Sequence, residues 1–292
     1  MKVVACIKQV PSVVDVKIDP QKNTLIREGV PSEINPFDEF AVEEAISIKE
    51  KYLFENVTAI SMGPPQAEEA LRACLGMGVD EAILLSDPLL AGSDTFATSY
   101  ALSRVIEEIG FDIIICGQES TDSSTGQVGP GIAEHLGIPQ VTFVSKIVRI
   151  FDNKIEVFRE VDKGYMVIES KLPILLTVVK GINTPRSSTS VDINKRVKKI
   201  GLEDMKYDPK KVGIEGSPTR VIKITYSKNI RNTLVSIPNH LSAHERIKMI
   251  MSGGIQENKS NNILFGSTLE NVHKVADLLF SENNNPNLEN KI

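Results

Sequence analysis

The sequence has few cysteines and no long apolar run. Cys6, Cys74 and Cys116 form an odd, unclustered set in apolar or helical contexts, which argues against a disulfide scaffold and against a metal site. No stretch approaches the length of about 18 apolar residues that a membrane-spanning helix needs. The first ten residues contain only a short apolar run, so we expect a first strand there rather than a signal peptide. These absences predict a cytoplasmic protein with no membrane span.

The chain also lacks a strong charge of either sign. Its formal net charge is −5 over 292 residues, which argues against a general nucleic-acid binder. Hydrophobic residues make up 41% of the chain and charged residues 24%, as in folded globular proteins. The length suits one large domain or two unequal ones.

Two common phosphate-binding motifs are missing, but a polar loop stands where such a motif would be expected. Asp112–Cys116 is a short isoleucine-rich run that predicts a buried strand, and 126–136 predicts a helix. The loop between them has neither the Gly-Lys-Ser/Thr of a P-loop nor the spaced glycines of a dinucleotide fingerprint. It is rich in hydroxyl side chains, namely Ser120, Thr121, Ser123, Ser124 and Thr125. Because a helix start offers free N–H donors and a partial positive charge, we expect phosphate groups here. A purely connecting polar loop is the alternative.

Strand-like and helix-like segments alternate along the first half of the chain. Strands are predicted at 3–7, 57–61, 82–85 and 113–116, and helices at 36–52, 65–77, 95–109 and 126–136. This order predicts an α/β fold with a doubly wound, mostly parallel sheet. Residues 14–29 predict a hairpin. The first and fourth strands are expected to flank the point where the strand order reverses, which is where such folds bind ligands.

The second half of the chain has a different pattern. Residues 141–150, 154–161 and 165–170 predict a β-meander inserted before a last core strand at 173–179. We therefore expect an α/β core over 1–180, an extended arm over 181–220, a C-terminal helical extension over 221–282 and a disordered tail over 283–292. The arm includes a basic stretch in an acidic chain, which suits either a solvated linker or a partner-docking segment.

Several motifs in a fixed order resemble the β subunit of electron-transfer flavoproteins. They are VVACIKQVP at the start, NPFDEFAVEEAISIKE at 35–50, SMGPPQAEEALRACLGMGVDEAILLSD at 61–87, the 117–130 loop, and NTPRSSTS followed by KRVKK. The resemblance covers roughly residues 1–220. It implies an adenine-nucleotide-binding α/β core and an α subunit that carries the electron-transferring FAD.

The resemblance leaves two branches of this family open. Most members bury one AMP in the β subunit, whereas the flavin-bifurcating branch holds a second FAD that takes a hydride from NADH. That branch passes electrons to ferredoxin or flavodoxin and, through the α subunit, to a flavin-dependent dehydrogenase. The segments AGSDTFATSY at 91–100, QVGP at 127–130 and AEHL at 133–136 resemble the bifurcating branch. Gln118 and Ser124 depart from its usual pattern.

The loop and the resemblance together predict the site residues. The nucleotide-binding set is Cys6, Lys8, Asn35, Asp38, Met62, Asp94, Thr95, Gly117, Asp122, Ser123, Ser124, Thr125, Gly126, Gln127, Val128, Gly129 and Pro130. Several have a structural alternative, because Asn35 and Asp94 are also good helix N-caps and Cys6 is also a small buried apolar residue. No protein acid–base catalyst is expected, since the flavin carries the chemistry.

The resemblance also predicts a contact with a partner enzyme. Arg186, Ser190 and Val191 are expected to touch the dehydrogenase, which would be of the acyl-CoA or 2-hydroxy-acid type. Many family members carry a leucine anchor where this chain has Ser190. Two other functions remain open: an ATP-binding regulatory protein of the universal-stress type, and an adenylating enzyme. The meander and the basic arm count against the first, and the missing pyrophosphate loop counts against the second.

Overall fold

The computed structural model describes residues 1–12, 18–19, 24–25, 32–189 and 196–222. The chain divides into two units, 1–224 and 225–292, and all of the described residues belong to the first unit. Residues 223–282 of the predicted helical extension, the predicted tail at 283–292, and the predicted partner residues Ser190 and Val191 lie outside the described residues.

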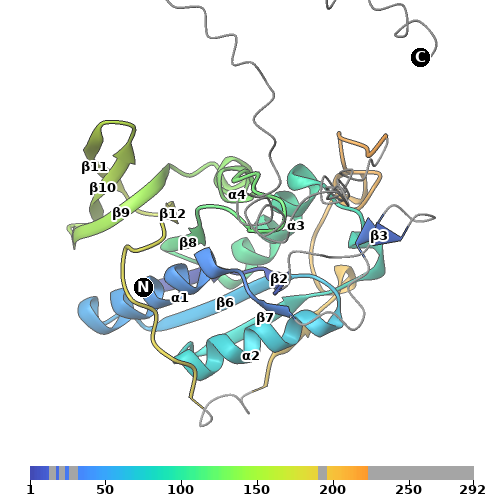
Figure 1. Cartoon of the computed structure of the whole chain (residues 1–292), viewed down its shortest axis with the longest axis horizontal. Helices are drawn as coiled ribbons and strands as arrows, with labels where there is room; N and C mark the ends of the chain where they lie inside the picture. The colour runs from blue at the N-terminus through green and yellow to red at the C-terminus, as the bar shows by residue number, and fades with distance from the viewer. Residues whose placement is uncertain (13–17, 20–23, 26–31, 190–195, 223–292) are drawn as a thin grey trace, which may run out of the picture. The chain divides into compact units, whose positions relative to one another are not determined.

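The centre of the fold is a sheet of nine strands in the order β11-β10-β9-β12-β8-β1-β6-β7-β13 (Figure 1). In chain order these strands are β1 (Lys2–Cys6), β6 (Asn56–Met62), β7 (Glu81–Leu85), β8 (Ile113–Gly117), β9 (Gln140–Phe151), β10 (Lys154–Val161), β11 (Gly164–Lys171), β12 (Ile174–Val178) and β13 (Lys198–Ile200). All neighbours from β9 to β13 along this order are parallel, and β9–β10 and β10–β11 are antiparallel. The predicted α/β fold with an inserted meander is confirmed.

In the described part of the chain, four α-helices cover the two faces of the sheet. They are α1 (Pro36–Tyr52), α2 (Glu68–Met77), α3 (Thr95–Ile109) and α4 (Val128–Leu136). Short 3-10 turns lie at Pro65–Ala67, Pro88–Leu90, Leu202–Asp204 and Pro209–Lys211. The segment predicted as one helix from residue 65 is thus a 3-10 turn followed by α2. The helix predicted from residue 126 begins two residues later, because Gly126 has a left-handed φ of 61°.

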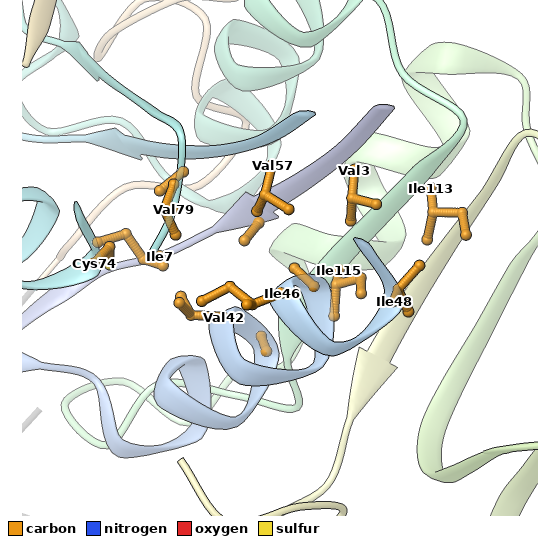
Figure 2. Packing of buried hydrophobic residues seen from close by; sticks show 14 of the residues in the cluster. Val3, Ile7, Val42, Ile46, Ile48, Val57, Cys74, Val79, Ile113 and Ile115 are labelled. Carbon is orange, nitrogen blue, oxygen red and sulfur yellow. The ribbon is translucent and has the colours of Figure 1, made fainter. Parts of the chain in front are cut away.

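Alternating side chains of the strands build two apolar cores. On β1, Val3 and Ala5 pack with α1 and α2, while Val4 and Cys6 pack with α3 and α4. Figure 2 shows the first core, in which Val42 and Ile46 of α1 face the sheet. Period-two alternation in strands that are buried on both faces produces this arrangement.

Short strands complete the described part of the chain. β2 (Gln9–Pro11) pairs with β5 (Ser32–Ile34), and β3 (Ile18–Asp19) pairs antiparallel with β4 (Thr24–Leu25). The β3–β4 pairing confirms the hairpin predicted at 14–29. In the described ranges, no helix is long and apolar enough to span a bilayer.

Candidate functional site

The site predicted from the sequence lies where β1 and β8 end. From β1 the chain runs outward through β6 to β7, then returns through α3 to β8 on the other side of β1. The strand order therefore reverses between β1 and β8, as predicted. In open α/β sheets, ligands bind beyond the carboxyl ends of the strands at such a point.

Two polar residues at the start of α1 hold this edge together. Asn35 is 1% exposed. Its Nδ2 donates to the Glu119 carbonyl over 2.8 Å, and its Oδ1 accepts the Thr121 N–H over 3.1 Å. Its side chain makes no capping hydrogen bond to α1, although it stands at the N-cap position. The capping role suggested by the sequence is therefore wrong, and Asn35 instead fixes the loop after β8.

Asp38 ties the two strand ends to each other. Its Oδ2 accepts the Lys8 N–H over 2.7 Å and its Oδ1 accepts the Gly117 N–H over 3.2 Å. Gly117 has room only for hydrogen, because a Cβ there would lie 2.3 Å from Asp38 Oδ1. Burial raises the pKa of Asp38 to about 7, although hydrogen bonds from the Lys8 amide, the Asn35 side chain and the Gly117 amide lower it.

The Lys8 side chain reaches the predicted phosphate loop. Its Nζ lies 2.5 Å from Asp122 Oδ1, 3.3 Å from Ser120 Oγ and 3.4 Å from Ser123 Oγ. Ser120 and Ser123 also share a hydrogen bond of 2.7 Å. The structure thus brings Lys8, Asp122 and Ser123 together, as the site prediction required. Ser120, which was named only as one of the loop hydroxyls, belongs to the same cluster.

The first turn of α4 lies at the same edge, because α4 is joined to β8 by this loop. The N–H groups of an α-helix's first turn have no acceptor within the helix, so those of Val128 and Gly129 are available to a ligand. Gly129 lets α4 approach the sheet, since a Cβ there would lie 3.0 Å from Thr177 Cγ2 and 3.5 Å from Cys116 Sγ. Ser124 and Gly126 have left-handed φ values of 48° and 61°, which turn the loop before the helix begins. Thr125 and Pro130 belong to the same loop and first turn.

Two cysteines lie under this turn. Cys6 and Cys116 are register partners on β1 and β8, and each is 7% exposed. The hydrogen bond between Cys116 and the Cys6 side chain, together with burial, raises the pKa of the Cys116 thiol well above its ordinary value. The Cys116 thiol therefore stays protonated. Both cysteines act as small packing residues of the second core. Met62 ends β6 at the same edge and packs against that core.

The Asp94 carboxylate is bonded within the chain. Its Oδ1 accepts the N–H groups of Phe96 and Ala97, and its Oδ2 accepts the Thr219 N–H over 3.0 Å and the Thr219 hydroxyl over 2.8 Å. Burial pushes the pKa of Asp94 upward, but these hydrogen bonds outweigh it and lower the pKa. Asp94 thus caps α3, the structural alternative weighed for it, and anchors the segment around Thr219. No local pattern in the sequence indicates this second role.

Thr95 contacts the residue that precedes α4. Its hydroxyl donates to Gln127 Oε1 over 3.0 Å, which links the start of α3 to the residue before α4. Thr95 and Gln127 therefore border the candidate site, whereas the Asp94 carboxylate is fully engaged elsewhere.

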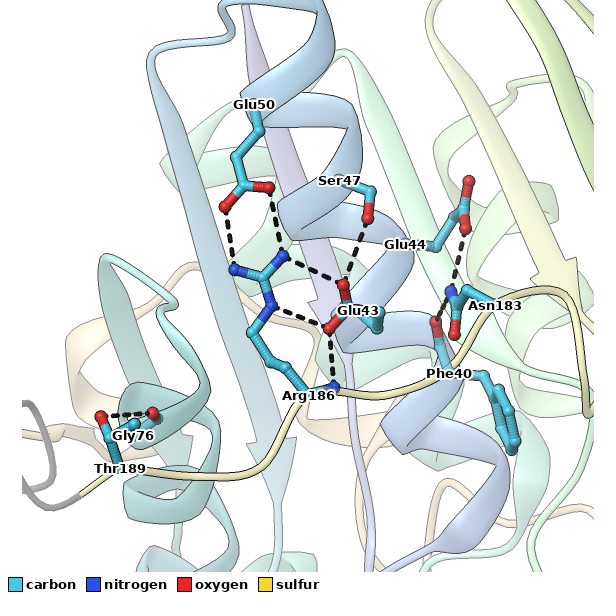
Figure 3. Close-up of polar contacts among 9 residues, drawn as sticks. All are labelled: Phe40, Glu43, Glu44, Ser47, Glu50, Gly76, Asn183, Arg186 and Thr189. Carbon is cyan, nitrogen blue, oxygen red and sulfur yellow. Dashed lines mark hydrogen bonds and ion pairs between the residues drawn. The ribbon is translucent and has the colours of Figure 1, made fainter.

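Arg186 is bound within the chain. Its guanidinium makes ion pairs with Glu43 and Glu50 of α1 (Figure 3). The predicted contact between Arg186 and a partner enzyme stays a prediction.

The site has the features that an adenine-nucleotide cofactor requires. Phosphate oxygens need N–H donors and positive charge. The α4 first turn supplies donors, and Lys8 would supply charge by exchanging the Asp122 carboxylate for a phosphate. These groups lie at the switch point, where Gly117 packs against Asp38 and Gly129 lets α4 approach the sheet. Ser61, near the end of β6, is 1% exposed, and its hydroxyl has no partner among the described residues. The residues therefore fit such a cofactor. The described part of the chain brings no three His, Cys, Asp or Glu side chains together as metal ligands.

Comparisons with known proteins identify the family of the chain. The electron transfer flavoprotein domain matches residues 22–203. An electron transfer flavoprotein subunit beta of Thermoanaerobacterium thermosaccharolyticum is 47% identical over 266 residues, which cover 89% of this chain and 96% of that protein. Subunit CarD of the caffeyl-CoA reductase-Etf complex of Acetobacterium woodii is 44% identical over 76% of this chain and 87% of CarD. Protein FixA of Azotobacter vinelandii is 42% identical over 77% of this chain and 83% of FixA. The chain therefore belongs to the electron transfer flavoprotein family, as a relative of its β subunits.

Proposed function

We propose that this chain is the β subunit of a flavin-bifurcating electron-transfer flavoprotein. In this proposal it pairs with an α subunit in the cytoplasm and holds FAD at the ends of β1 and β8. NADH is the transient electron donor. Ferredoxin or flavodoxin receives one electron, and the α-subunit FAD passes the other to a flavin-dependent dehydrogenase of the acyl-CoA or 2-hydroxy-acid type.

The observation that carries the proposal is the glycine-bearing loop that joins β8 to α4 at the switch point. Lys8 and the α4 first turn lie at this edge of the sheet and would bind the negative charge of a diphosphate. Similarity to CarD, whose name places it in a complex with a CoA-thioester reductase, supports a dehydrogenase-type partner. The segments at 91–100, 127–130 and 133–136 resemble the bifurcating branch.

The residues of the chain would bind and orient the cofactor. Lys8 and the amides of Val128 and Gly129 would hold phosphate oxygens, while Asn35 and Asp38 keep the loop and the strand ends in place. The bound flavin supplies hydride acceptance and single-electron transfer. No side chain of the site is needed as an acid or base for that chemistry.

Two departures from the sequence pattern of the bifurcating branch keep AMP as the alternative ligand. Ser124 stands where a second acidic residue is common in that branch, and Gln118 stands where a basic residue is common. A β subunit that holds AMP would keep the same fold and the same phosphate contacts.

The test is to produce the chain with its α subunit and to count ligands. We expect two flavins per heterodimer by absorbance and by chromatography of the released cofactors. A Lys8→Met variant should lose the β-subunit ligand, whereas Lys2→Met should retain it, because the Lys2 ammonium bonds the Ile109 carbonyl at the opposite edge of the sheet. One flavin with one AMP would move the chain to the AMP-binding branch. ATP hydrolysis without flavin would refute both branches.

A further inference from the structure

Residues 120–124, a few positions after β8, form a turn that is closed by its own hydrogen bonds. The Ser120 carbonyl accepts the Ser123 N–H over 3.4 Å and the Ser124 N–H over 2.7 Å. The Ser124 hydroxyl donates to the same oxygen over 3.3 Å. Because Ser124 has a left-handed φ of 48°, the chain curls back here. The 120–124 turn is therefore a compact unit within the phosphate loop.

The backbone and the side chains of this turn are held by different residues. Asn35 bonds the Glu119 carbonyl and the Thr121 N–H, so it anchors the backbone. Lys8, in contrast, contacts only side chains of the turn, those of Ser120, Asp122 and Ser123. The contacts of Lys8 can therefore change while the anchored backbone stays in place.

The oxygens of the turn match the donors of the Lys8 ammonium in number. A lysine ammonium has three N–H donors. Asp122 Oδ1 lies 2.5 Å from Lys8 Nζ, Ser120 Oγ lies 3.3 Å from it and Ser123 Oγ lies 3.4 Å from it. A phosphate oxygen that binds the Lys8 ammonium must therefore replace one of these three oxygens.

The chemistry of the three side chains decides which one is replaced. A serine hydroxyl both donates and accepts, so Ser120 and Ser123 can turn their O–H groups toward a phosphate oxygen. An ionised carboxylate only accepts hydrogen bonds, and it repels a second anion nearby. The Asp122 carboxylate is therefore the group that a phosphate has to replace on Lys8.

This replacement has a cost, because the pair of Lys8 and Asp122 is partly shielded from water. The Asp122 side chain is 10% exposed and that of Lys8 is 38% exposed. Charges attract more strongly where less water surrounds them, and a carboxylate that leaves an ammonium loses a charge-assisted hydrogen bond. A neutral side chain at position 122 would not oppose the phosphate in this way.

We propose that Asp122 is an internal competitor for the phosphate of the nucleotide. Its carboxylate and the phosphate exchange on the Lys8 ammonium, so Asp122 lowers the affinity of the site and takes over Lys8 when the nucleotide leaves. This rests on the proposed function, because the phosphate belongs to the adenine nucleotide named there. Asp122 then sets the strength of binding through Lys8 and does not hold the ligand itself.

The experiment measures AMP binding to the complete heterodimer by equilibrium dialysis with labelled AMP, after the β-subunit ligand has been dialysed out. AMP is the part that both candidate ligands share, and the FAD of the α subunit reports that each variant is assembled. Adenosine, which lacks the phosphate, is the second probe. The variants are Asp122→Asn, Asp122→Ala, Lys8→Met and the double variant K8M/D122N.

Glu119→Gln is the matched control. It removes one carboxylate from the same loop, and among the described residues the contacts of the Lys8 ammonium with this loop are those with Ser120, Asp122 and Ser123. It therefore tests the effect of loop charge apart from the pair.

If Asp122 competes with the phosphate, Asp122→Asn and Asp122→Ala should each lower the Kd of AMP by about fivefold, as expected for loss of a partly exposed ion pair. Lys8→Met should raise this Kd by about tenfold. Adding Asp122→Asn to Lys8→Met should then change nothing further, because the competition needs the ammonium. The Kd of AMP in Glu119→Gln, and the Kd of adenosine in the Asp122 variants, should stay within about twofold of wild type.

Three results would overturn this inference. Weaker AMP binding in both Asp122 variants would show that the carboxylate positions Lys8 or contacts the ligand. An unchanged Kd in both would show that the carboxylate and the phosphate do not compete. A gain that also appears in Glu119→Gln, or that persists beside Lys8→Met, would assign the effect to the overall charge of the loop. All three leave the proposed function standing, whereas a wild-type heterodimer whose β subunit binds neither AMP nor FAD would refute that function and this inference with it.

Discussion

The buried carboxylate of Asp38 should make the stability of this chain fall as the pH rises toward neutrality. Its pKa is about 7 in the folded chain, against 3.8 for an ordinary aspartate. Between these values the unfolded chain has released a proton that the folded chain still binds, so the free energy of unfolding decreases with pH. The contribution is fully present below pH 3.8 and is lost as the pH passes through about 7.

The magnitude depends on the size of the pKa difference. At about 1.4 kcal/mol for each pKa unit, the whole shift corresponds to roughly 4 kcal/mol. Asp38 is 6% exposed, so solvent screening removes little of this. Between pH 5 and pH 8 the free energy of unfolding should fall by roughly 3 kcal/mol through the titration of Asp38.

The perturbation is Asp38→Asn, which removes the titration and keeps one oxygen as an acceptor for a strand amide. Urea unfolding of wild-type and variant heterodimers at several pH values gives the stability difference. We expect wild type to lose roughly 3 kcal/mol relative to the variant between pH 5 and pH 8. Asp112→Asn is the matched control, because Asp112 also accepts a strand amide, that of Lys2, over 2.6 Å. The pH dependence assigned to Asp38 is the part of the wild-type change in the free energy of unfolding that Asp38→Asn removes and Asp112→Asn does not. If wild type and Asp38→Asn differ in the free energy of unfolding by the same amount at every pH, the reasoning is refuted.

Three further substitutions test the site and its frame. Lys8→Met should reduce the β-subunit nucleotide retained after desalting by about tenfold, because a charge-assisted contact is lost; full retention, measured by chromatography, would remove Lys8 from the site. Asp94→Ala should lower stability by about 1–2 kcal/mol through loss of the α3 cap and leave nucleotide content unchanged, whereas lost nucleotide would return Asp94 to the site. Gly117→Ala should cost about 1–3 kcal/mol and also reduce nucleotide content, because the new methyl group displaces Asp38; a stable variant with normal content would show that the strand ends tolerate a wider spacing.

Local patterns in the sequence predict most of the elements. The isoleucine-rich run before Gly117, the helical spacing of apolar residues from Pro36 to Tyr52, and the three successive strands of the meander all correspond to elements of the structure. These signals are local, since the period of apolar residues depends on which faces of an element are buried. The start of the helix near Gly126 is predicted less accurately. The sequence does not distinguish a glycine with a left-handed φ just before a helix from a glycine that is the first residue of the helix.

The roles of polar residues are harder to predict. Asn35 has the sequence signature of a cap, yet its amide bonds a loop 84 positions later in the chain. Asp94 is predicted to bind the nucleotide, yet both its oxygens are used, partly by Thr219, 125 positions away. Arg186 is predicted to touch a partner, yet it is clamped to α1. Each of these contacts joins segments that only the fold brings together.

Residue types and their spacing along the chain are enough to predict the succession of strands and helices, the polar loop after β8 and the family. Which polar groups are already paired within the chain is known only from the folded structure, because a buried carboxylate or amide must find its hydrogen-bond partners wherever the folded chain places them. For Asn35 and Asp38 those partners lie far away in sequence, and Asp94 adds the distant Thr219 to the local cap that its sequence position indicates.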